Sequence, residues 1–129
     1  MDAKEAGCCE VSKQNYRTYD LACGKSAVLL WYLPVLALIA GLNWAEGRPW
    51  LWIPAFAVMG VACLVNAARC GRLHCYVTGP VYLLAALYTA FAAYGILPLR
   101  PGLFLTIVLG IAVLALCAEC PLGTYRRKA

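Results

Sequence analysis

The sequence predicts an all-α integral membrane protein, a four-helix bundle with both termini in the cytoplasm, and three observations support this fold class. The chain of 129 residues is 64% hydrophobic and only 13% charged, which is unlike an ordinary soluble domain. Its apolar residues form four long runs instead of the short periodic stripes of a surface helix. Its basic residues are distributed very unevenly among the segments that connect these runs.

The first two apolar runs cover residues 26–42 and 49–67. A helix of about 20 residues crosses a hydrocarbon core of roughly 30 Å, so the first run is near the lower limit and the second is sufficient. Pro34 and Pro54 lie inside these runs. Because each proline removes one backbone hydrogen bond, we expect a local bend in both helices.

The third run covers residues 76–97 and the fourth covers residues 103–120. Small residues recur every four positions in the third run, at Ala85, Thr89 and Ala93, and this spacing allows close helix packing. The connections between the runs are short. We therefore expect sequential helices to be antiparallel neighbours in a compact bundle.

The positive charges predict the orientation of these helices. Two of the eleven basic residues, Arg48 and Arg100, lie in the first and third connections. The other nine lie in the two tails and the middle connection, at Lys4, Lys13, Arg17, Lys25, Arg69, Arg72, Arg126, Arg127 and Lys128. Since cytoplasmic segments carry the excess of lysine and arginine, both tails and the middle connection are expected in the cytoplasm.

The predicted organisation has three parts in a multi-pass protein of the inner membrane. Residues 1–25 form a polar cytoplasmic tail that contains cysteines, residues 26–121 form the transmembrane domain, and residues 122–129 form a basic cytoplasmic tail. The polar start of the chain and the absence of a convincing cleavage site argue against a secretory signal. The first helix is therefore expected to be an uncleaved anchor.

Several function classes do not fit this sequence. The basic residues form no stripe with interleaved aromatic residues, so no nucleic-acid partner is expected. No G-x-x-x-x-G-K-[ST] motif is present, so no nucleotide is expected. No serine–histidine–acid arrangement supports a hydrolase, and enzyme activity is less expected than binding.

The cysteines are the main functional signal. In the predicted topology all eight lie on the cytoplasmic side, where thiols stay reduced. Thiolates are good ligands for soft metal ions such as mercury(II), copper(I) and zinc. The placement therefore favours soft-metal binding, or thiol exchange with a cytosolic partner, over structural disulfides.

The densest group of candidate ligands is the middle connection, with Cys70, His74 and Cys75. Arg69 and Arg72 stand beside these thiols and favour their thiolate forms. The following Thr-Gly-Pro at residues 78–80 is expected to interrupt regular helix.

A second group lies at the end of the fourth run. Cys117 and Cys120 are three residues apart, so a helix places them on one side. With Cys70 and Cys75 on the same membrane face, four thiols could form one metal site. Cys8 and Cys9 form a vicinal pair in the amino-terminal tail that could bind soft ions and pass them on. The predicted metal ligands are Cys70, Cys75, Cys117, Cys120, His74, Cys8 and Cys9.

Two further residues receive structural interpretations. Cys63 lies within an apolar run and is expected to pack as a small hydrophobic residue. Glu119 is costly near hydrocarbon unless it is paired, and Arg69, Arg72 or Arg126 is the expected partner.

The chain resembles the small mercury-transport membrane proteins of bacterial resistance operons in its size, its short spans, the Cys8-Cys9 pair and a second cysteine set at the cytoplasmic surface. In that family a cysteine pair lies inside the first helix, whereas residues 26–42 here contain none. The run CGRLHCYVTGP is also similar to one found in uncharacterised small bacterial membrane proteins. The resemblance implies transport of a soft metal ion.

The leading hypothesis from the sequence is a membrane protein that binds a soft metal ion and passes it across the bilayer or to a cytosolic thiol protein. A homo-oligomer or a larger membrane complex would supply room for a pathway. One alternative is a quinone-linked membrane thiol oxidoreductase with Cys117 and Cys120 as its redox pair. The other is a non-catalytic subunit or scaffold of a larger membrane complex.

Overall fold

The computed structural model describes residues 28–122, and this part of the chain is almost entirely helical. The π-helical turn η2 (Val28–Tyr32) leads directly into α2 (Leu33–Asn43). The helices α3 (Arg48–Cys70), α4 (Leu73–Ala93) and α5 (Pro101–Leu122) follow. The all-α prediction and the four helical segments are confirmed for this range. The predictions for the two tails and for Cys8 and Cys9 lie outside the described residues.

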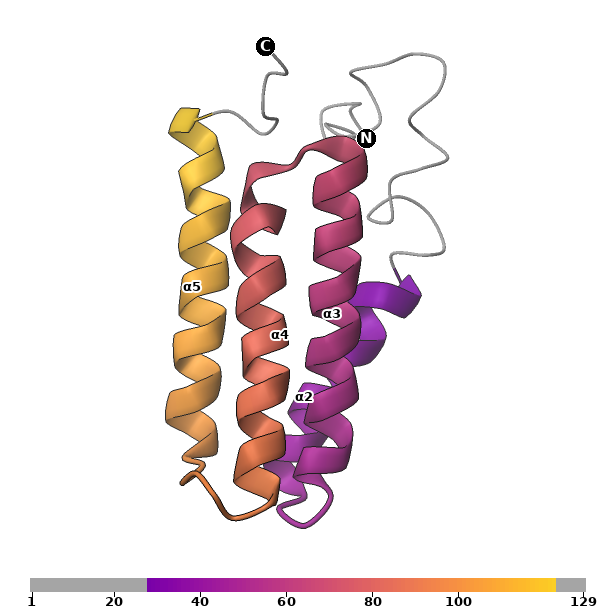
Figure 1. The fold of residues 1–129 in the computed structure, drawn as a ribbon, viewed down its shortest axis with the longest axis vertical. Helices are drawn as coiled ribbons and strands as arrows, with labels where there is room; N and C mark the ends of the chain where they lie inside the picture. Colours follow the sequence, from indigo (N-terminus) through magenta and orange to yellow (C-terminus); the bar gives the residue numbers. More distant parts are fainter. Residues whose placement is uncertain (1–27, 123–129) are drawn as a thin grey trace.

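Helices α3, α4 and α5 lie side by side with α4 in the middle, while α2 packs against α3 (Figure 1). Consecutive helices run in opposite directions because short connections join them. One end of the molecule carries the loops at residues 44–47 and 94–100. The other end, called here the thiol end, carries the α3–α4 junction and the last turns of α5 (Figure 1).

Three helices are long and apolar enough to cross a membrane, at Arg48–Arg69, Leu73–Ala93 and Pro101–Pro121. The first apolar helix, Val28–Asn43, is shorter. In Figure 1 its indigo start lies part of the way along α3 and does not reach the thiol end. The described part of the first helix therefore leaves the flanks of α3, α4 and α5 uncovered near their thiol end.

The core follows helical spacing on α3 and α4. The buried residues of α3 lie three or four positions apart, at Trp52, Ala55, Phe56, Met59, Ala62, Cys63, Asn66 and Ala67. Those of α4 have the same spacing, at Cys75, Thr78, Gly79, Tyr82, Ala85, Ala86 and Thr89. This spacing forms one contact stripe on each helix. Most other apolar side chains of α2 and α5 are exposed, as expected for surfaces that face lipid.

Two glycines set the close approach of α3 and α4. A Cβ atom added to Gly60 would lie 3.1 Å from the carbonyl oxygen of Gly79 and 2.8 Å from Leu83 Cδ2. A Cβ atom added to Gly79 would lie 2.8 Å from Leu64 Cδ2. Small residues at a membrane helix crossing allow such short separations. The sequence pattern pointed to Ala85, Thr89 and Ala93, of which the first two are buried and Ala93 is exposed, and it missed this tighter glycine contact.

Several predicted boundaries were wrong for identifiable reasons. Helix α4 begins at Leu73 and ends at Ala93, because Gly95 adopts a positive φ of 74° and the amide of Ile96 donates back to the carbonyl of Phe91. The helix also continues through Pro80, so the expected interruption there does not occur. The Thr78 hydroxyl donates to the His74 carbonyl at 2.9 Å, which keeps this polar side chain satisfied inside the helix.

Candidate functional site

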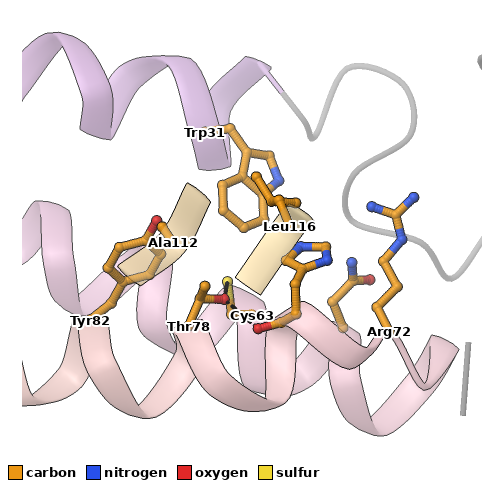
Figure 2. A pocket seen from close by; sticks show the side chains of 9 residues that line it. Trp31, Cys63, Arg72, Thr78, Tyr82, Ala112 and Leu116 are labelled. Carbon is orange, nitrogen blue, oxygen red and sulfur yellow. Dashed lines mark hydrogen bonds between the residues drawn. The ribbon is translucent and has the colours of Figure 1, made fainter. Parts of the chain in front are cut away.

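A cavity of about 320 Å³, mainly apolar but lined by several polar side chains, lies near the thiol end (Figure 2). Its lining comes from η2, α3, the α3–α4 junction, α4 and α5, and consists of Trp31, Cys63, Asn66, Arg72, His74, Thr78, Tyr82, Ala112 and Leu116. Figure 2 shows Trp31 across the cavity from Cys63 and Thr78, with Tyr82 towards one end and Arg72 towards the other. Polar groups that converge inside a hydrophobic bundle mark this cavity as the candidate functional site.

Two thiols from neighbouring helices meet beside this cavity, and one of them, Cys63, lines it. Cys63 is 1% exposed and Cys75 is fully buried, and the two thiols are close enough to interact with each other. Both are free thiols. The Thr78 hydroxyl oxygen lies 3.4 Å from Cys63 Sγ, and the Asn66 side chain is fully buried nearby and also lines the cavity. The Gly60–Gly79 contact, one helical turn away from each cysteine, explains why the two helices are close enough for this pairing.

His74 connects this thiol pair to α5. Its Nε2 atom lies 3.3 Å from Cys75 Sγ, and its Nδ1 atom lies 2.6 Å from Glu119 Oε1. The backbone amide of His74 also donates to Glu119 Oε1 at 3.1 Å. Helix α4 has no side-chain cap from its own N-cap residue, Arg72. Glu119 therefore acts as a cap supplied by another helix, because it accepts from an amide of the first turn and places negative charge at the helix N-terminus.

The structure places the Glu119 carboxylate against His74, with 2.6 Å between Oε1 and Nδ1. Of the arginines predicted as its partner, Arg126 lies outside the described residues. The inference that this carboxylate ties the end of the fourth helix to the middle connection is nevertheless confirmed by both contacts with His74.

The structure brings together only part of the predicted ligand set. His74 and Cys75 lie in the first turn of α4, where His74 lines the cavity and Cys75 is fully buried, whereas Cys117 and Cys120 are exposed on α5. Cys70 is the last residue of α3, at the same end of the molecule. Within residues 28–122, no three side chains of histidine, cysteine, aspartate or glutamate are grouped as ligands of one metal ion. The proposed joining of the middle connection with Cys117 and Cys120 in a single cage stays a prediction.

Sequence reasoning missed three components of the site. Cys63 is buried as expected, but it contacts Cys75 and Thr78 and lines the cavity, so its surroundings are not simply apolar. Trp31 and Tyr82 were not predicted as site residues, although Trp31 fitted the aromatic residues expected at a membrane interface. The helical spacing of small and apolar residues could have identified Cys63. The buried stripe of α3 passes through Cys63, and the facing stripe of α4 passes through Cys75 and Thr78.

Comparison of the chain with protein-family models, with curated proteins and with solved structures gives no match. The functional argument therefore depends on the chemistry of this cavity.

Proposed function

We propose that this protein binds a soft metal ion, namely copper(I), mercury(II) or zinc, and carries it across the inner membrane as a multi-pass transporter. The observation that supports this proposal best is the proximity of the Cys63 and Cys75 thiols beside a cavity that Cys63 lines. Sulfur ligands select soft ions over magnesium or calcium, which prefer oxygen.

The donor set fits a site with few ligands. Both ring nitrogens of His74 already contact other groups, Cys75 on one side and Glu119 on the other. The two sulfurs are therefore the primary ligands, and a third ligand requires His74 to give up one contact. Two-coordinate thiolate binding suits copper(I) and mercury(II) better than zinc, which is usually bound by four ligands.

The position of the pair suits transfer of an ion. An ion held by two thiolates can move stepwise if an incoming thiolate binds before an outgoing one leaves. The thiol end carries further cysteines on α5, and a cytosolic thiol protein would find acceptor and donor sulfurs at the same end. The bilayer is the expected environment, and a homo-oligomer or a larger membrane complex would provide the pathway through it.

The proposal is tested by metal retention in protein purified in detergent under anaerobic conditions. We expect one equivalent of copper(I) or mercury(II) to survive desalting in the parent and to be lost in the variant Cys63→Ser/Cys75→Ser. The matched control Cys117→Ser/Cys120→Ser removes two exposed thiols from α5.

The result separates three possibilities. Retention by the control but not by the cavity variant supports the proposed site. Retention by the cavity variant, with loss in the control, assigns binding to the exposed pair and contradicts the proposal. Metal retention without ion flux in vesicles contradicts transport and favours a structural metal in a larger complex.

A further inference from the structure

We propose that Cys63 and Cys75 are also a redox-active pair, which is oxidised to a disulfide between α3 and α4 by a quinone bound in the cavity. This inference does not depend on metal binding. It moves the redox pair from Cys117 and Cys120, which the sequence suggested, to the two thiols that the fold holds in contact.

The thiol pair is suited to disulfide formation. Its members belong to different helices and lie next to each other, and the Gly60–Gly79 crossing one turn away keeps the two backbones close. A disulfide requires short separations between the two backbones, which neighbouring helices reach only at such crossings. In contrast, Cys117 and Cys120 lie on the surface of one helix, away from the cavity lining.

The cavity provides features that suit a quinone ring. Its volume of about 320 Å³ is sufficient for a ring-sized headgroup, and it adjoins the apolar exterior through which a hydrophobic tail would extend. Trp31 and Tyr82 supply aromatic walls. Within the described residues, Trp31 Nε1 is buried without a hydrogen-bond partner, and such a donor is costly unless an acceptor such as a quinone carbonyl reaches it.

His74 is placed to accept the proton that leaves the thiol pair. Nε2 of His74 lies beside Cys75 Sγ, and Glu119 orients the ring from its other side. This order of nucleophile, histidine and carboxylate is the one that activates thiols and hydroxyls in enzymes. His74 is therefore assigned as a positioning and proton-relay residue for Cys75.

The reaction balances as a two-electron exchange. Cys75 loses its proton to His74 Nε2, and the thiolate forms a bond to Cys63 Sγ as the two sulfurs give up two electrons and the second proton. The quinone accepts the two electrons and both protons, one of them through His74, and becomes the hydroquinone. The products are one disulfide and one hydroquinone for each quinone consumed.

The test mixes reduced, metal-free protein in detergent with a short-chain ubiquinone under anaerobic conditions. The readouts are hydroquinone formation and the alkylation state of each cysteine by mass spectrometry. We expect one hydroquinone per protein and a peptide pair linked through Cys63 and Cys75. Cys63→Ser should abolish both signals, and Cys117→Ser/Cys120→Ser should leave them unchanged.

Two further measurements keep the test decisive. Trp31→Phe retains an aromatic ring without the donor, so the quinone concentration for half-maximal rate should rise about fivefold, the effect of losing one neutral hydrogen bond. Oxidation by diamide, which does not use the cavity, should proceed equally in the parent and in Trp31→Phe. If diamide forms the disulfide but ubiquinone does not, the quinone assignment is overturned, and if neither does, the redox pair is overturned. Neither failure affects metal retention, which is measured on reduced protein without quinone.

Discussion

The contact between Glu119 and His74 gives the sharpest prediction about how the site is held together. One carboxylate oxygen accepts from the His74 amide at 3.1 Å and contacts the ring Nδ1 at 2.6 Å, and both side chains are only 11–12% exposed. A hydrogen bond to a charged group contributes roughly 1.5–3 kcal/mol. Because water partly replaces the lost partner, we expect Glu119→Ala to lower the free energy of unfolding by about 3 kcal/mol.

The more conservative variant separates charge from shape. Glu119→Gln keeps an oxygen that can accept from the His74 amide but removes the negative charge. We therefore expect this variant to lower the free energy of unfolding by about 1–2 kcal/mol. The only other acidic residue in the described part, Glu46, is exposed in the loop between α2 and α3. Glu46→Gln is therefore a matched control and should change stability by less than about 0.5 kcal/mol.

The assay combines unfolding in mixed SDS and maltoside micelles with hydrogen exchange followed by mass spectrometry. The first turn of α4 should exchange faster in Glu119→Ala and not in Glu46→Gln, because only the former frees the His74 amide. If the two variants unfold alike and exchange in this turn is unchanged, Glu119 does not cap α4 and the reasoning is refuted.

Two other perturbations test the packing that supports the site. Gly60→Ala places a methyl group 3.1 Å from a backbone oxygen of α4, so we expect the free energy of unfolding to fall by about 1–3 kcal/mol and disulfide formation to slow. Gly110→Ala is the control, because its methyl group meets open space and should leave the free energy of unfolding unchanged. Arg48 donates to the Gly41 carbonyl at 2.8 Å and lies 5.6 Å from the centre of the Trp52 ring, so Arg48→Gln should lower the thermal midpoint by several degrees. The exposed Arg100→Gln serves as its control, and equal midpoints would contradict the packing role.

Much of the fold could be predicted because membrane length and helical spacing are strong sequence signals. Residues 49–67 and 103–120 identified α3 and α5 to within a few residues of their ends. The end of α4 was missed because Gly95 terminates the helix before the apolar run stops at residue 97. The length of an apolar run shows how much of the chain is compatible with lipid. The end of a helix is instead determined by its last backbone hydrogen bonds, so the two boundaries need not coincide.

The site was predictable only in part, for a different physical reason. His74 and Cys75 were identified from residue chemistry alone; His74 lines the cavity, and Cys75 lies directly beside His74. The partners of these residues depend on which helix faces meet, and residue types do not determine that. Cys63 looked like an apolar core residue because its sequence neighbours are apolar, while its spatial neighbours on α4 are a second thiol and a hydroxyl.

The most direct test of the central claim is the sulfur coordination of a bound ion, measured by X-ray absorption on protein loaded with one equivalent of copper(I). The account predicts a shell of two sulfurs in the parent and in Cys117→Ser/Cys120→Ser, with loss of that shell in Cys63→Ser/Cys75→Ser. An unchanged sulfur shell in the cavity variant would contradict the claim that these two thiols form the metal site.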